Sequence, residues 1–167
     1  MCSSDLGVVH GGTYTAHSVA LAAAERTLQI LEETDALERI ADYGKRMQEG
    51  FSGILSRRGI PHSFTGHPAM GGLIFSETPP KNYREWATSD YTLYDALAQR
   101  LLDRGILCEP DSREPWFVSA AHNELCLAET LAKFERAADA TLERLTDPRK
   151  PTAREGRPLP RSFANPN

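Results

Sequence analysis

The feature of this 167-residue sequence that most constrains its fold is a long run of helical periodicity over residues 35–57. Apolar side chains recur there at spacings of three, four and seven, at Leu37, Ile40, Met47, Phe51, Ile54 and Leu55. This spacing gathers them on one face of an amphipathic helix, which packing must cover. Asp35 and Glu38 predict the helix start as a capping box, and Gly59 predicts its end.

Three further helices are predicted, over residues 18–33, over residues 89–104, and from residue 123 to just before Pro148. The third of these four helices, which ends at Gly105, is expected to turn Tyr94, Ala98, Leu101 and Leu102 inward. Short extended segments lie between the helices: a hairpin over residues 60–76 with its turn at 66–68, and strands at 106–108 and 116–119. The fold class is therefore α+β, with a small antiparallel or mixed sheet of three or four strands covered by helices.

The two ends of the chain have a different composition from the middle. Residues 1–6 follow neither a helical nor a strand pattern, and we expect a non-native or disordered leader there. Residues 147–167 carry five prolines and several arginines, and we expect them to be disordered.

Charge and composition exclude several classes of partner. The net charge of −4 and the pI near 5.7 argue against nucleic acid and against an anionic membrane surface. No apolar run approaches the roughly 20 residues of a membrane span, so a cytoplasmic protein is predicted. Cys2, Cys108 and Cys126 are scattered without metal-ligand spacing, which favours reduced thiols and no metal site.

A glycine and hydroxyl cluster immediately precedes the first predicted helix, with Gly11, Gly12, Thr13 and Thr15 as its members. Glycine lets the backbone approach a ligand, and threonine hydroxyls and helix-terminal N–H groups donate hydrogen bonds to anions, of which phosphate is the natural one. The alternative is that Thr15, His17 or Ser18 only caps the helix. Both interpretations are open at this point.

Other polar residues suggest chemistry less strongly. His62, His67 and His122 lie at turns or strand ends without the spacing of a ligand set, so turn and cap roles are favoured over metal binding. Ser119 and His122 could suggest a hydrolase, but they form no nucleophile elbow and no third member is evident.

Three segments together resemble the C-terminal part of class III pyridoxal-phosphate (PLP)-dependent aminotransferases, and most closely the glutamate-1-semialdehyde 2,1-aminomutase branch. They are residues 10–23 (HGGTYTAHSVALAA), 66–75 (GHPAMGGLIF) and 114–123 (EPWFVSAAHN), within a match that spans about residues 8–145. The sequence departs from the family where Ala16-His17-Ser18 stands in place of the usual Gly-Asn-Pro helix entry.

The resemblance implies a fold-type-I dimer of full-length subunits acting on a small-molecule amino substrate. Residues 7–33 would end the large PLP-binding domain, and residues 34–146 would form the C-terminal small domain. Gly12 and Thr13 would bind the cofactor phosphate of the neighbouring subunit. Glu114 matches the acidic position of the aminomutase branch, where many related transaminases place an arginine for a substrate carboxylate; the alternative is a surface carboxylate beside Arg113.

The chain shows no candidate for the catalytic lysine of such an enzyme. Lys45, Lys81, Lys133 and Lys150 all stand in contexts typical of solvated surface, and the family pattern puts the catalytic lysine upstream of Gly7. The chain alone is therefore predicted to be inactive. The alternatives are an ω-amino-acid or other class III transaminase, and a non-enzymatic α+β domain that dimerises through the helix at 18–33.

Overall fold

The computed structural model describes residues 11–146, and side chains as far as residue 143. The described chain forms two compact units, residues 11–38 and residues 39–146, and each is treated by itself. The predictions for residues 1–6 and 147–167 lie outside the described residues.

The first unit contains helix α1, Ser18–Glu33, with the bounds that the sequence predicts. His17 caps its start, because the ring Nδ1 accepts a hydrogen bond from the backbone N–H of Ala20 at 3.2 Å. Thr34 follows its end in an extended conformation, and the Thr34 hydroxyl donates to the carbonyl of Ile30 at 2.7 Å. No residue of α1 is buried.

Helix α2, Ala36–Ser56, is the long amphipathic helix predicted from the spacing of its apolar residues. Phe51, Ile54 and Leu55 are buried, as expected for its apolar face. The chain leaves the helix at Gly59, whose φ of 65° is unstrained only for glycine. The backbone N–H of Ile60 then donates to the carbonyl of Leu55 at 3.1 Å and closes the last turn.

The sheet has three antiparallel strands in the order β1-β2-β3: β1 Ser63–His67, β2 Met70–Ile74 and β3 Trp116–Phe117. The first two form the predicted hairpin, in register from Ser63 opposite Ile74 to His67 opposite Met70. β3 is shorter than predicted and pairs only with Met70 and Gly71 of β2.

The prediction of a strand at residues 106–108 is wrong. The backbone N–H of Ile106 donates to the carbonyl of Leu101 at 2.9 Å, so it closes the end of a helix and is not available for a ladder. The side chains of Ile106 and Cys108 instead pack against the core. Apolar composition predicted burial here, but burial does not require a strand.

Three further helices complete the second unit. α3, Tyr83–Trp86, is a single turn that the sequence does not predict. α4, Tyr91–Leu102, begins at Asp90, whose carboxylate accepts from the N–H of Leu93 at 2.9 Å. α5, Glu124–Thr146, agrees with its predicted range. The prediction that Leu102 faces inward is wrong, because its side chain is 53% exposed.

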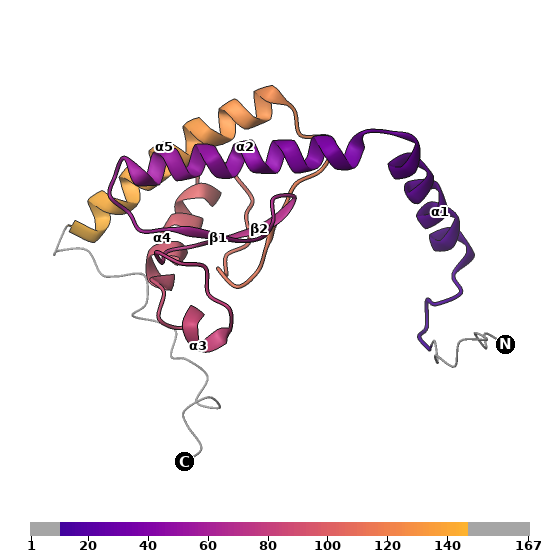
Figure 1. Ribbon diagram of the computed structural model, residues 1–167, viewed down its shortest axis with the longest axis horizontal. Coiled ribbons are helices and arrows are strands. Elements are labelled where there is room, and N and C mark those ends of the chain that lie inside the picture. The colour runs from indigo at the N-terminus through magenta and orange to yellow at the C-terminus, as the bar shows by residue number, and fades with distance from the viewer. Residues whose placement is uncertain (1–10, 147–167) are drawn as a thin grey trace, which may run out of the picture. The chain divides into compact units, whose positions relative to one another are not determined.

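The core lies where α2, α4 and α5 meet β2, and α2 and α5 run side by side over the sheet (Figure 1). The rings of Phe51 and Phe134 stack with their centroids 3.9 Å apart, and Trp116 meets Phe51 edge-on at 5.5 Å. Among the described residues, the largest fully buried side chains are Tyr94, Phe51, Phe134, Leu55, Leu97, Leu101 and Thr141. These features confirm the predicted α+β fold class.

Ion pairs connect α2 to α5 along the outside of this core. The guanidinium of Arg58 bonds the carboxylate of Asp139, with Nε 2.7 Å from Oδ1, and also reaches Glu135. The Arg58 side chain is only 15% exposed, so this pair is better shielded from water than an ordinary surface pair. The hydrogen bonds that Arg58 donates to Asp139 hold the pKa of the Asp139 carboxyl below its usual range.

Two glycines of α2 give a matched test of this packing. A Cβ at Gly44 would lie 2.1 Å from the carbonyl oxygen of Pro68, whereas a Cβ at Gly53 would meet only the Arg57 guanidinium at 3.6 Å. We expect Gly53→Ala to stabilise the chain by about 0.5–1 kcal/mol, because alanine favours a helix over glycine. Gly44→Ala should destabilise it by about 1–3 kcal/mol, because backbone must move. Urea unfolding followed by circular dichroism measures both, and equal effects would contradict the packing of α2 on the hairpin turn.

The Arg58–Asp139 pair gives a pH dependence of stability. A carboxyl whose pKa is lowered by folding adds stability above its unfolded pKa, and that stability is lost as pH falls through the folded pKa. The urea midpoint of the wild-type chain should therefore exceed that of Asp139→Asn at neutral pH, and the gap should close below the ordinary Asp pKa of 3.8. The comparison variant is Asp103→Asn, because the Asp103 carboxylate bonds Gln99 and Arg100 of the adjoining helix α4 and does not join α2 to α5. A gap between the wild-type chain and Asp139→Asn that does not change with pH would contradict this assignment.

Candidate functional site

The glycine and threonine cluster forms a turn directly before α1. The backbone N–H of Thr15 donates to the carbonyl of Gly12 at 3.2 Å, and the N–H of His17 donates to the carbonyl of Tyr14 at 3.1 Å. Gly12 and Thr13 are both exposed. A Cβ at Gly12 would lie 2.9 Å from the hydroxyl oxygen of Thr15, so glycine suits this close turn.

The capping role in this stretch belongs to His17, one of the three residues that the sequence offered for it. Within residues 11–146, the Thr13 hydroxyl makes no hydrogen bond. The first turn of α1 contains no acidic residue. A free hydroxyl, exposed backbone N–H groups and the positive end of a helix form a donor set that suits an anion such as phosphate. This is compatible with the predicted role of Gly12 and Thr13, which stays a prediction.

Glu114 lies in the second unit, on the loop formed by residues 109–115, between α4 and β3. The loop makes a tight turn, in which the backbone N–H of Glu114 donates to the carbonyl of Asp111 at 3.0 Å. The neighbouring Arg113 does not pair with Glu114. Its guanidinium bonds the Asp111 carboxylate and lies 5.1 Å from the centre of the Trp86 ring.

The Glu114 side chain is therefore exposed, and no described residue gives it a hydrogen bond or an ion pair. This exposed position is compatible with the alternative, a surface loop carboxylate beside Arg113, and with the predicted substrate-side role, which stays a prediction. Arg113 acts on Glu114 through its charge without an ion pair, so Glu114 presents its carboxylate at the surface of residues 39–146.

The lysines that the structure describes lie on the surface or in ordinary ion pairs. Lys45 is 3.9 Å from Glu49 on α2, Lys133 is 2.6 Å from Glu129 on α5, and Lys81 is exposed in a loop. Lys150 lies outside the described residues. A lysine that forms a Schiff base is usually desolvated or placed beside another cation to lower its pKa, and these three surroundings differ from that.

The histidines of the second unit serve turns and local contacts. His62 bridges the Ser52 hydroxyl and the carbonyl of Ile60, each at 2.8 Å. The His67 ring accepts from the N–H of Ala69 at 3.2 Å. The structure does bring Ser119 and His122 together, at 3.1 Å, but the same ring nitrogen accepts from the Ser119 N–H at 3.0 Å. The pair is a local turn at the exit of β3.

A cavity of about 390 Å³, which the sequence analysis did not identify, opens between α2, α5 and the loop ahead of β3. Its lining includes Tyr43, Met47, Cys108, Trp116, Phe117 and His122. Burial raises the pKa of the Cys108 thiol to about 11, so Cys108 is a thiol and not a nucleophilic thiolate at neutral pH. The apolar runs at 106–108 and 116–119 are the sequence signal for this cavity; both are predicted as strands, and the structure has a strand only at Trp116–Phe117.

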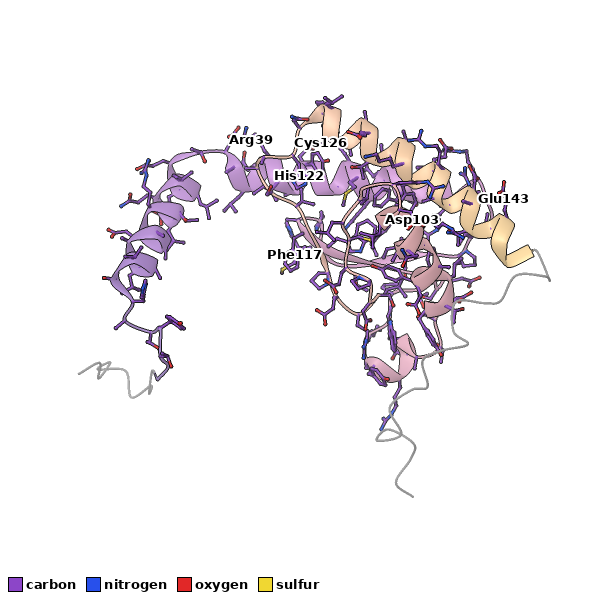
Figure 2. All side chains as sticks on the ribbon, turned by 180° about the vertical axis from the view of Figure 1, so that it is seen from behind. Arg39, Asp103, Phe117, His122, Cys126 and Glu143 are labelled. Atoms are coloured by element: carbon purple, nitrogen blue, oxygen red, sulfur yellow. The ribbon has the colours of Figure 1, made fainter. Side chains whose placement is uncertain are left out.

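Apolar side chains are exposed beside this cavity. Leu107 is 89% exposed and Phe117 70% exposed, and Figure 2 shows Phe117 at the outer edge of this unit. His122 and Cys126 lie near one another at the start of α5 in the same view. Surfaces of this kind commonly mark an interface.

Within residues 11–146, no three His, Cys, Asp or Glu side chains gather as a metal-binding group. None of the described helices combines the length and the apolar character needed to cross a membrane.

Comparisons with known proteins relate this chain to PLP enzymes. No protein-family model matches it. It is 34% identical to a glutamate-1-semialdehyde 2,1-aminomutase of Thermus thermophilus over 131 residues, which are 78% of this chain and 31% of that protein. It is also 34% identical over 124 residues to an aminomutase of Brevibacillus brevis, covering 74% of this chain and 29% of that protein.

Solved structures give the same picture. The FumI protein of Sphingopyxis sp. MTA144, solved in a PLP form, superposes with a TM-score of 0.69 at 28% identity, over 83% of this chain and 31% of that one. An omega-transaminase of Sphaerobacter thermophilus shares the fold with a TM-score of 0.67 at 23% identity, over 81% of this chain and 31% of that one.

The comparisons thus give the class of fold: the aligned segment shares the fold of solved PLP-dependent transaminases. In sequence it is similar to the glutamate-1-semialdehyde 2,1-aminomutases, as the three motifs indicated. The chain spans about a third of the length of the curated relatives it matches.

Proposed function

We propose that this chain is the C-terminal segment of a PLP-dependent aminomutase or aminotransferase that acts on an amino acid or amino aldehyde. The observation that carries the proposal is the 34% identity to an aminomutase over 78% of the chain. Residues 7–33 would then end the large domain and residues 34–146 would form the small domain, which agrees with a division of the described chain near residue 38.

The exposed apolar side chains support this division. Val19, Leu21, Leu28 and Ile30 of α1 are each at least 43% exposed, so α1 carries apolar side chains that the described chain does not cover. Leu107 and Phe117 of the second unit are exposed in the same way. A large domain of the same polypeptide, and the second subunit of a homodimer, would cover such faces.

In the proposed enzyme, Gly12 and Thr13 would bind the phosphate of the cofactor, and Glu114 would face the substrate. Thr13 and the backbone of Gly12 would donate to the phosphate of PLP carried by the neighbouring subunit. PLP supplies an electron sink for reactions at the carbon that bears the amino group. Glu114 would attract the ammonium end of a substrate and repel a second carboxylate, which disfavours exchange with dicarboxylic keto acids.

The second candidate is a non-enzymatic α+β domain that dimerises through α1, and the exposed apolar side chains of α1 favour it. The two candidates differ in what the genome should contain. An enzyme requires about two to three hundred further residues upstream, with a large domain and its lysine. A coding sequence that starts at Met1 under its own promoter would favour the interaction domain. An ω-amino-acid or other class III transaminase is the alternative within the enzyme class, and net transfer to a keto acid would distinguish it from isomerisation.

The isolated chain should be catalytically silent, because none of its described lysines has the surroundings of a Schiff-base lysine. Incubation with PLP followed by borohydride should leave no stoichiometric, site-specific label on Lys45, Lys81, Lys133 or Lys150 when the peptides are analysed by mass spectrometry. A chimera in which residues 7–146 replace the equivalent segment of the Thermus thermophilus aminomutase should be labelled on the host lysine. A stoichiometric label on one of the four lysines would contradict the proposed role of a segment that needs a large domain.

Replacement of Thr13 in the same chimera tests the proposed binding of phosphate by Gly12 and Thr13. Thr13→Ala removes a hydrogen bond to a charged group, so PLP affinity should fall by about 1.5–3 kcal/mol, or roughly tenfold to a hundredfold in Kd. Dialysis against decreasing PLP, followed by its absorbance, gives the measurement. The matched control is Thr27→Ala on α1, where the hydroxyl bonds only the carbonyl of Ala23 at 2.8 Å. Unchanged PLP retention in Thr13→Ala would return this turn to the capping interpretation.

A further inference from the structure

Both tryptophans of the chain hold the loop that carries Glu114. The Trp86 indole, at the end of α3, donates from Nε1 to the Ser112 hydroxyl at 2.9 Å. The Trp116 indole, in β3, donates from Nε1 to the Tyr94 hydroxyl at 2.6 Å. Ser112 is only 5% exposed although it lies in a loop.

The Tyr94 hydroxyl joins the two ends of this loop. It accepts from Trp116, just after the loop, and donates to the carbonyl of Glu109, at its start, at 2.7 Å. Tyr94 lies on α4 and is 1% exposed. Burial raises the pKa of Tyr94, so the phenol keeps its proton and its donor role at neutral pH.

The middle of the loop is fixed on the face of Trp86. The Arg113 guanidinium lies over the Trp86 ring and bonds Asp111. The Trp86 ring also contacts Tyr83 and Tyr91, with ring centroids 5.3 and 5.5 Å away. Pro110 and Pro115 restrict the backbone at either end. Among the charged residues at 111–114, Glu114 alone has an exposed side chain that forms no hydrogen bond or ion pair with a described residue.

We propose that Tyr94 and Trp86 are positioning residues, which hold residues 109–115 in one conformation so that Glu114 is already in place when the substrate binds. The proposal rests on the proposed function, because it takes Glu114 as the substrate-side carboxylate. A polar loop of this kind is mobile by default, and ordering it at each binding event would weaken the interaction. Hydrogen bonds from α3 and α4 order it in advance.

The full chain itself tests the restraint, because its two tryptophans give two indole N–H signals in a ¹⁵N–¹H spectrum. Tyr94→Phe keeps the ring and removes the hydroxyl. The Trp116 indole should then exchange faster and shift, together with the amides of Asp111, Arg113 and Glu114. Ser112→Ala should move the Trp86 indole instead, and it serves as the second variant if Tyr94→Phe does not fold.

Tyr43→Phe is the matched control, because Tyr43 is also buried, at 6% exposure, and lines the cavity beside the loop, but its hydroxyl bonds Thr130 of α5 and no residue of 109–115. Tyr43→Phe should leave the amide signals of the loop residues unshifted in the ¹⁵N–¹H spectrum. Loop amides that stay unchanged in both Tyr94→Phe and Ser112→Ala would overturn the proposal.

The chimera with the Thermus aminomutase tests whether the restraint acts through Glu114. Tyr94→Phe should lower kcat/KM of the host reaction about tenfold, mainly by raising KM, with PLP retention unchanged. If Tyr94 works through Glu114, the double variant Tyr94→Phe/Glu114→Gln should be no worse than Glu114→Gln alone. Tyr43→Phe combined with Glu114→Gln should instead show independent effects.

The failures of the two proposals are distinguishable. A double variant whose loss equals the product of the two single losses would overturn the positioning role and leave the role of Glu114 intact. An inert Glu114→Gln would overturn both the substrate-side assignment and the positioning role that rests on it, even where the spectra show an ordered loop.

Discussion

The stack of Phe51 on Phe134 is the contact on which the second unit depends. It joins α2 to α5 with ring centroids 3.9 Å apart, and Trp116 of β3 meets the same Phe51 edge-on. Two helices far apart in the sequence and one short strand thus share a single aromatic cluster. Aromatic rings bury large apolar areas in defined geometries, so the cluster fixes the helix pair and the end of the sheet together. The Arg58–Asp139 pair then closes the outer edge of the same helix pair.

The position of β3 follows from this cluster and leads to the candidate site. β3 has only two residues and pairs with β2 at Met70 and Gly71, too few for the ladder alone to hold it. Trp116 compensates, because its ring packs on Phe51 and its indole N–H bonds Tyr94. Trp116 thereby also fixes the end of the polar loop that precedes β3, and Glu114 lies on that loop. Trp116 therefore connects the core packing with Glu114, the carboxylate for which a substrate-side role is proposed.

The first unit has a different character. α1 forms from its own local signals, with a histidine cap and an Ala-rich sequence, and it buries nothing. An isolated helix of 16 residues is marginal in water, and most helices in proteins gain their stability from packing. The exposed apolar residues of α1 and its phosphate-compatible turn both fit a segment that is completed by other polypeptide, as the proposed function requires.

The sequence by itself determined the four long helices, the β1–β2 hairpin and the relation to aminomutases, because helical spacing, caps and glycine turns are local signals. It also marked Gly12, Thr13 and Glu114, through their motifs. Tertiary structure decided the rest. Residues 106–108 look like a strand but have no partner edge, since Ile106 closes α4. Arg113 stands next to Glu114 in the sequence and instead bonds Asp111 and covers Trp86. Those choices depend on contacts between residues distant in the chain, and no local pattern encodes them.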